Sequence, residues 1–387
     1  MTERHAVVGL LLVVFLALPC PAASQSVDEW RTRFAAGEQA RQAGEHRVYA
    51  TEMAAAADAL PEDVLNRPFI QYHAARAAAL AGDADAAVYW LRTTWDEGLE
   101  SLMISFAPFD PAFADIVDDS DFLAVMALAA EIELSVRRLG GSVHLIVGAG
   151  ANVVAQVGSD GVFLVDTGYG SALPALQAAL ASLSNMPVSR LLVTHPHEDH
   201  MGATPELGAA VTVLAHPGTT AAMRAQYDFM DGVSMPPKPQ QALPDVEISG
   251  DTTFVFNGET VRVVPTLAHT GGDLSVYFSD AHVAHFGDSY LPGNPMIYPG
   301  TEDPDGFLDR LEAFIGSMDL ATVVVGGHEE IGDLAAVRAQ IEVSRACMAF
   351  VRGAMEDGLT IEQTAEQGVD RFPPQWVAFF YGLFASR

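Results

Sequence analysis

The chain has 387 residues, half of them hydrophobic, which suffices for a large folded core and makes wholesale disorder unexpected. Its formal net charge of −30 gives a surface that repels phosphate backbones and anionic lipid headgroups. We therefore expect neither nucleic acid nor a membrane surface as a partner, and we expect one large domain beside a smaller one.

Residues 1–23 have the pattern of a secretory signal peptide. A short basic start precedes an apolar segment at residues 6–18, and small residues suit cleavage near Ala23. The apolar segment is shorter than the roughly 20 residues that cross a bilayer, so we expect no membrane span in the mature chain. Cleavage predicts a periplasmic or secreted protein. Because of Cys20, a lipoprotein remains an alternative prediction. The mature chain then keeps only Cys347 and forms no internal disulfide.

Residues 24–140 are rich in alanine and have a helical pattern. Residues 72–80 and 84–95, joined by Gly82-Asp83, indicate a helix, a tight turn and a second helix. Residues 29–60 indicate an earlier hairpin of the same kind. Small residues at the packing positions resemble tetratricopeptide-type hairpins. This all-α region is expected either to contact a protein partner or to form a helical cap on the second domain.

The pattern changes to strands in the expected second domain, residues 141–387. A first set of strands is predicted, with a helix at 171–183 for which Ser171 is the expected N-cap. A proline-rich loop over 233–245 separates it from a second set, and an aromatic segment near the C-terminus is expected to pack back on the domain. Two successive sets with intervening helices indicate two sheets with helices outside. The predicted strands are 143–147, 152–157, 162–165, 191–193, 211–214, 253–256, 261–266, 275–278, 283–286 and 322–325, and the later helices are 305–316 and 333–355.

The run His195-Pro-His-Glu-Asp-His200 directly follows a predicted strand. Imidazole and carboxylate groups are the donors that zinc and neighbouring transition metals accept. His195 and His197 are two apart, so their side chains point the same way on an extended stretch. A bend before Gly202 lets Asp199 and His200 face a second ion. The run therefore predicts a metal site.

The later part of the chain supplies further candidate ligands in a recognisable order. His269 follows a strand, Asp288 lies in Gly-Asp-Ser, and His328 ends Val-Gly-Gly-His. Together with the HxHxDH run, and with Asp166 ending an early strand, this order resembles the metallo-β-lactamase superfamily of hydrolases over residues 142–332. The resemblance implies an α/β fold, namely an αββα sandwich with a dinuclear site at one edge.

The resemblance also implies a role for each ligand. The first metal is expected on His195, His197 and His269, the second on Asp199, His200 and His328, and Asp288 is expected to bridge them. Two zinc ions are expected, with iron or manganese as alternatives, and they would lower the pKa of a shared water.

Several other residues near these motifs need a role. Asp166 is expected to orient a ligand, and either Asp199 or a metal-bound water is expected to handle the proton in catalysis. Tyr290 either donates to an oxyanion or packs in the core. Four residues are not expected to bind metal: His216, His282, His285 and Glu198.

The expected function is that of an exported dinuclear zinc hydrolase with a small-molecule substrate. A metal-bound hydroxide would attack the carbonyl of an ester, lactone, thioester or amide. A bridging aspartate like Asp288 resembles the lactonase, thioesterase and glyoxalase II-like members, so a β-lactamase is a secondary expectation. The alternatives are an iron-dependent persulfide oxygenase, which metal analysis would identify, and a non-catalytic periplasmic partner-binding protein.

Overall fold

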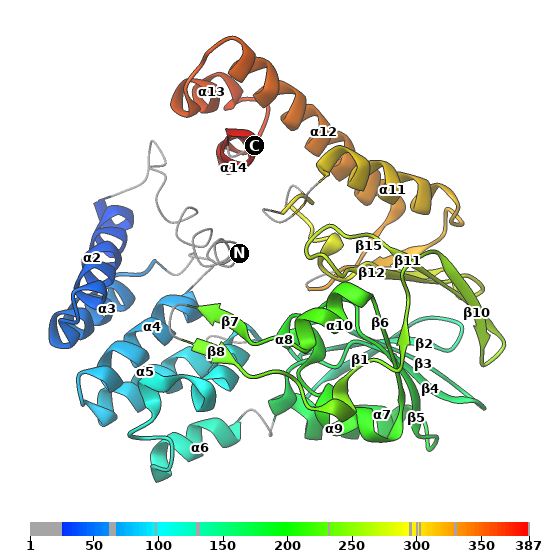
Figure 1. Ribbon diagram of the computed structural model, residues 1–387, viewed down its shortest axis with the longest axis horizontal. Coiled ribbons are helices and arrows are strands. Elements are labelled where there is room, and N and C mark those ends of the chain that lie inside the picture. The colour runs from blue at the N-terminus through cyan, green and yellow to red at the C-terminus, as the bar shows by residue number, and fades with distance from the viewer. Residues whose placement is uncertain are drawn as a thin grey trace. The chain divides into compact units, whose positions relative to one another are not determined.

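The computed structural model describes residues 25–61, 67–96, 99–128, 132–230, 233–293, 296–298, 301, 303–328 and 331–385 (Figure 1). The predicted signal peptide, residues 1–23, lies outside the described residues. The chain divides into two compact units. The helical unit runs to Glu133 and includes Tyr169–Ala175 and Gln226–Pro236, and the sheet unit contains the rest. None of the helices in the described ranges has both the length and the apolar character needed to cross a membrane.

The helical unit contains the two predicted hairpins. They are formed by α2 (Gln25–Gln42) with α3 (His46–Asp58), and by α4 (Arg67–Leu80) with α5 (Ala84–Asp96). Gly44 and Gly82 have φ angles of 72° and 81° in the turns, a conformation that glycine adopts without steric cost. The 3₁₀ segments η1 (Leu99–Phe109) and η2 (Pro111–Phe113) and the helix α6 (Ser120–Leu128) follow.

An ion pair lies inside the helical unit. Arg76 Nε donates to Asp110 Oδ2 at 2.5 Å, and the Tyr72 hydroxyl donates to the same oxygen at 3.2 Å. Asp110 Oδ1 also accepts from Ala112 N at 2.9 Å, which caps η2. The pair joins α4 to the start of η2. Separating these segments would leave a buried guanidinium without its carboxylate, which is strongly destabilising.

The first sheet of the sheet unit has the order β1-β2-β3-β4-β5-β6-β9. Neighbours from β1 to β4 are antiparallel, and those from β4 to β9 are parallel. The parallel strands need crossovers, which include α7 (Leu173–Leu183) and α10 (Pro217–Met223). The strands are β1 (Ser135–Gly140), β2 (Val143–Val147), β3 (Val153–Gly158), β4 (Gly161–Val165), β5 (Val188–Leu192), β6 (Thr212–Ala215) and β9 (Val246–Glu247).

The second sheet has the order β10-β11-β12-β13-β14-β15 and is antiparallel except for the β13–β14 pair. Its strands are β10 (Thr252–Phe256), β11 (Glu259–Pro265), β12 (Leu274–Phe278), β13 (Val283–His285), β14 (Val323–Val325) and β15 (Gly332–Asp333). The helices that follow or interrupt it are α11 (Pro304–Gly316), α12 (Leu334–Glu356), α13 (Ile361–Gly368) and α14 (Pro374–Ala385).

The two sheets share a hydrophobic core. Phe163 of β4 contacts Phe256 and Phe278 of the second sheet, with ring centroids 5.8 and 5.9 Å apart. The other face of the second sheet packs with α11 and α12, and α14 packs on α12 and α13 in the same core (Figure 1), where Phe307 and Phe380 are fully buried. The predicted αββα arrangement and the packing of the C-terminal aromatic segment are confirmed.

Three local predictions were wrong. Residues 135–140 form the edge strand β1 and are not helical, because the polar run at Arg137 and Arg138 suits an exposed sheet edge. Ser171 lies inside the 3₁₀ turn η4 (Gly170–Ala172), where its Oγ contacts Ser105 Oγ at 2.5 Å instead of capping the helix. The predicted loop over 233–245 begins with β8 (Val233–Met235), which pairs with β7 (Tyr227–Met230).

Candidate metal centre

The HxHxDH run forms a tight turn directly after β5. His197 has extended backbone angles and precedes the single-turn helix α8 (Glu198–Met201). His200 N and Met201 N donate to His197 O at 3.1 and 3.0 Å. An isolated turn this short is unstable in water, so contacts with the rest of the domain must fix it.

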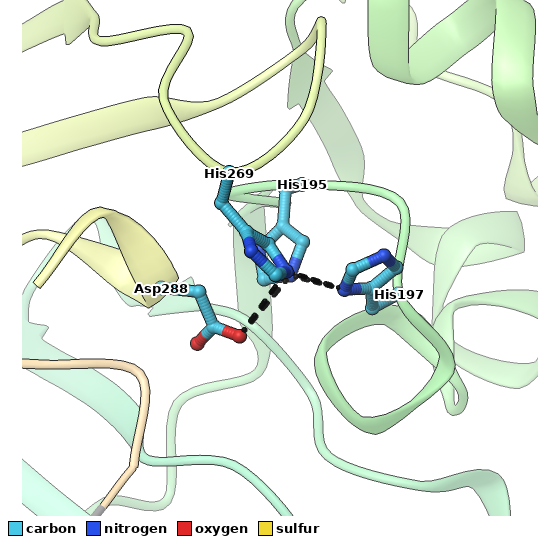
Figure 2. A group of neighbouring side chains, drawn as sticks. All are labelled: His195, His197, His269 and Asp288. Atoms are coloured by element: carbon cyan, nitrogen blue, oxygen red, sulfur yellow. Dashed lines mark hydrogen bonds and ion pairs between the residues drawn. The ribbon is translucent and has the colours of Figure 1, made fainter. Parts of the chain in front are cut away.

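The first group of ligand atoms comes from His195, His197, His269 and Asp288, with His197 and Asp288 on opposite sides of the other two (Figure 2). His195 Nε2 lies 3.0 Å from His197 Nδ1, and His269 Nε2 lies 2.8 Å from the same nitrogen. Asp288 Oδ2 is 3.4 Å from His269 Nε2 and 3.8 Å from His195 Nε2. Ligands about 2.1 Å from a tetrahedral ion lie about 3.4 Å apart, so these separations suit one shared ion.

The second group contains Asp199, His200 and His328. His328 Nε2 is 3.1 Å and His200 Nε2 is 3.5 Å from Asp199 Oδ2. Asp288 Oδ1 faces the same group, at 3.2 Å from His200 Nε2 and 3.5 Å from His328 Nε2. The two oxygens of Asp288 therefore point to different groups, as a bridging carboxylate requires.

Two atoms that face the second group lack a hydrogen-bond partner. His200 Nε2 and Asp288 Oδ1 are buried 3.2 Å apart, and neither makes a hydrogen bond. Buried polar atoms in folded proteins are almost always paired, so such atoms call for an explanation. A cation between them would satisfy both, and the donor set of imidazoles and carboxylates is one that zinc, iron and manganese accept. The residues present thus fit a pair of divalent ions.

The first group is kept ready for metal by burial. Desolvation lowers the pKa of His195 well below its usual value and lowers the pKa of His269 to about 3. Desolvation also lowers the pKa of His197. These rings are therefore neutral at pH 7, and a neutral imidazole has the lone pair that binds a metal.

The second group has the opposite electrostatics. Burial disfavours a charged His328, but Asp288 and Asp199 outweigh burial and raise the pKa of His328 to about 10. Burial opposes ionisation of Asp199 too, yet His200 and His328 lower the pKa of Asp199 to about 2. Without a metal the carboxylates thus hold protons on these histidines, and binding of an ion would displace those protons.

Asp166 fixes the orientation of one ligand in each group. Its Oδ2 accepts from His200 Nδ1 at 2.7 Å and from Thr194 Oγ1 at 2.8 Å, and its Oδ1 accepts from Thr194 N at 2.7 Å. Thr194 Oγ1 lies 3.1 Å from His195 Nδ1. Because the Nδ1 atoms are engaged on this side, the Nε2 atoms of both histidines face the ligand groups.

All seven predicted ligands lie in one stretch that matches a known family. Residues 146–328 match the model described as metallo-beta-lactamase superfamily. These residues form a metallo-beta-lactamase superfamily domain. The match covers both ligand groups and Asp166. Of the helical unit it includes only the two short segments Tyr169–Ala175 and Gln226–Pro236.

The relatives and solved structures agree with this assignment. A hydroxyacylglutathione hydrolase of Cereibacter sphaeroides is 28% identical over 43% of this chain and 59% of its own. Another, of Acidiphilium cryptum, is 29% identical over 36% of this chain and 49% of its own. The chain thus spans about half the length of these curated relatives. A double mutant of the sec-alkyl sulfatase PisA1 of Pseudomonas sp. shares the fold, with 16% identity, a TM-score of 0.50, and coverage of 67% of this chain and 51% of that chain.

The C-terminal ligand loop of the metallo-beta-lactamase domain is fixed by Asn152. Its backbone N–H donates to Gly327 O at 2.7 Å and its side chain donates to Gly326 O at 3.1 Å. His285 Nε2 in turn donates to Asn152 O at 3.1 Å, so His285 lies beside the site and belongs to neither ligand group. A Cβ on Gly327 would lie 1.7 Å from Asp288 Oδ1, which explains why this position has no side chain.

Two tyrosines near the centre have different surroundings. Tyr290 is buried in the core, with its ring 6.4 Å from that of Phe286, which supports the packing alternative. Tyr298, which the sequence did not single out, donates its hydroxyl to Asp288 O at 2.7 Å. Its ring centroid lies 4.3 Å from that of His269. Tyr298 therefore braces two ligands.

The remaining candidates lie outside both ligand groups, as expected. His216 caps α10, because its Nδ1 accepts from Gly218 N at 3.0 Å. His282 lies in the turn between β12 and β13, with a φ of 52°. Glu198 belongs to neither ligand group and binds Lys238, with its oxygens 2.8 and 2.6 Å from Lys238 Nζ.

Proposed function

We propose that this protein is a metal-dependent hydrolase that cleaves a small-molecule carbonyl compound at a dinuclear centre, with zinc as the first expected metal. The observation that carries the proposal is the placement of Asp288, whose two oxygens face two separate groups of three ligands. The similarity to hydroxyacylglutathione hydrolases supports thioesters as the first substrates to test, before esters, lactones and amides.

Such a centre, counted as two ions and their ligands, would carry a net positive charge. Bound divalent cations supply Lewis acidity and lower the pKa of a water molecule that they hold. Asp199 and Asp288 contribute two negative charges against the four positive charges of two such ions, since the remaining ligands are imidazoles. This excess of positive charge favours substrates whose transition state is an oxyanion.

The protein's own residues hold two of the predicted ligands rigidly. His195 and His200 are almost fully buried, and Asp166 and Thr194 hold their rings from behind. A pKa of about 2 keeps Asp199 ionised at neutral pH, as a ligand requires. We assign to Asp199 the transient relay of the proton released when water attacks the carbonyl, because a carboxylate with a pKa of about 2 does not retain that proton at neutral pH.

We also propose that the protein is exported and that the helical unit is a tetratricopeptide-like region that contacts another protein. Export is supported by the pattern of residues 1–23 alone. The partner role is supported by the two consecutive hairpins with glycine turns. N-terminal sequencing of protein recovered from the periplasm would test the first point, since an uncleaved cytoplasmic chain would contradict it.

The activity can be tested with the full chain and a matched variant. Purified protein would be reconstituted with zinc, iron or manganese and assayed against thioesters, lactones, β-lactams and phosphodiesters. We expect thioester turnover in the zinc form and none in Asp288→Ala. Iron-dependent oxygen consumption with a persulfide, or turnover that survives Asp288→Ala, would contradict the proposal.

A further inference from the structure

Lys238 is unusual in both its abundance and its position. It is the only lysine in the sequence, in a chain whose net charge is −30. Its side chain is only 10% exposed, and that of its partner Glu198 is 14% exposed. Lysine side chains usually extend their ammonium group into solvent. The burial of Lys238 therefore indicates that its contact with Glu198 fixes the position of the side chain.

The backbone around Lys238 is restricted by neighbouring prolines and by a hydrogen bond. Pro236, Pro237 and Pro239 surround it, and each proline fixes its own φ angle and restricts the residue before it. The Lys238 N–H also donates to Met223 O at 2.8 Å, at the end of α10. Little backbone freedom is therefore left to lose when the ammonium group binds its partner.

The partner is the residue between two metal ligands. Glu198 separates His197 from Asp199 and is the first residue of α8. The other end of α8 is fixed separately, because His200 O accepts from Thr167 N at 2.7 Å and from Thr167 Oγ1 at 3.1 Å. The contact of Lys238 with both oxygens of Glu198 secures the end that carries His197 and Asp199.

We propose that Lys238 is a positioning residue for the metal centre, acting through Glu198 to hold His197 and Asp199 in place for the two ions. This inference rests on the metal centre of the proposed function but not on its substrate. Since His197 belongs to the first ligand group and Asp199 to the second, the loss of Lys238 should weaken both ions. Partners that orient metal ligands contribute about 10- to 100-fold in metal affinity.

The test measures metal affinity by competition with a chromophoric chelator, using the full chain and zinc alone. Lys238→Met should bind zinc about 10-fold or more weakly. Lys238→Arg should restore most of the loss, because a guanidinium also pairs with both oxygens of a carboxylate. Glu198→Gln should add little to Lys238→Met because the two act as one unit. Arg345→Met, which removes an exposed pair with Asp309, is the matched control and should bind zinc normally.

A second readout uses the uniqueness of Lys238. In protein labelled with ¹³C at lysine Cε, the single side-chain signal should shift when zinc is added and should not respond to zinc in the Asp288→Ala variant. Unchanged zinc affinity in folded Lys238→Met would overturn the inference, and a raised KM with unchanged affinity would assign the lysine to substrate binding instead. An absence of hydrolysis for every substrate, with weakened zinc binding in Lys238→Met, would refute the proposed function and leave this inference standing.

Discussion

The replacement of Asp166 by Asn tests whether ligand orientation depends on one buried carboxylate. Three donors converge on Asp166, namely Thr194 N, Thr194 Oγ1 and His200 Nδ1. Asn has nearly the same shape and tolerates the φ angle of 62° at this position, so packing and backbone are preserved. Its amide offers one acceptor oxygen and replaces the other by an NH₂ donor.

The expected magnitude follows from this mismatch. Either orientation of the Asn amide places its NH₂ group against at least one buried donor. A hydrogen bond to a charged group contributes about 1.5–3 kcal/mol, so we expect a loss of about 2–3 kcal/mol in unfolding free energy. If His200 shifts its proton to Nε2 to relieve the clash, that nitrogen can no longer bind the second ion. Metal affinity should then fall about 10- to 100-fold.

The assay is chelator competition for zinc together with urea unfolding of the metal-free chain. Asp280→Asn is the matched control, because Asp280 Oδ2 accepts a single backbone bond from Thr260 N at 2.8 Å in an exposed turn. The control should lose at most about 1 kcal/mol and no metal affinity. Wild-type affinity for both ions in Asp166→Asn would refute the reasoning.

Three further predictions concern other parts of the chain. His195→Ala should abolish turnover while circular dichroism shows an intact fold, and residual activity above a hundredth of wild type would count against a role as ligand. Gly327→Ala should lower zinc content, because the new Cβ would lie 1.7 Å from Asp288 Oδ1. Gly353→Ala in α12 is the control, because its new Cβ would have nothing within 4 Å, and its unfolding free energy in urea should rise by up to about 1 kcal/mol. Desolvation and nearby Arg76 lower the pKa of His73 well below its usual value. The unfolded chain therefore binds a proton below about pH 6.5 that the native chain does not, so stability falls as pH falls below 6.5. His73→Phe should reduce the slope of that dependence by the share of one proton in urea titrations at pH 4 to 7, because other buried histidines keep theirs.

The ligands of the HxHxDH run could be predicted because they are marked locally, and the other three because their order after successive strands resembles that of the family. His195, His197 and His200 lie within one short run, and Asp288 and His328 follow strands whose apolar residues are plain in the sequence. Metal ligands at strand ends keep their order in the chain even where the strands pair in a different order. The alternation of strands and helices indicated two sheets with helices outside, and the resemblance to the family implied the αββα sandwich.

The supporting residues could not be predicted because their signals are not local. Thr194 looks like an ordinary strand residue, and its role depends on Asp166, which lies 28 positions away. Lys238 and Glu198 are 40 positions apart, in segments with no periodic pattern that would place them together. β1 was missed for a related reason, since an exposed edge strand has little of the apolar alternation that identifies a buried one.

Metal stoichiometry tests the central claim most directly. The purified full chain, loaded with zinc and passed through a desalting column, would be analysed by plasma mass spectrometry beside Asp288→Ala. We predict two zinc ions per wild-type chain and a loss of both from Asp288→Ala, because each oxygen of Asp288 faces a different group. One ion or none in the wild type, or two in Asp288→Ala, would contradict the dinuclear centre.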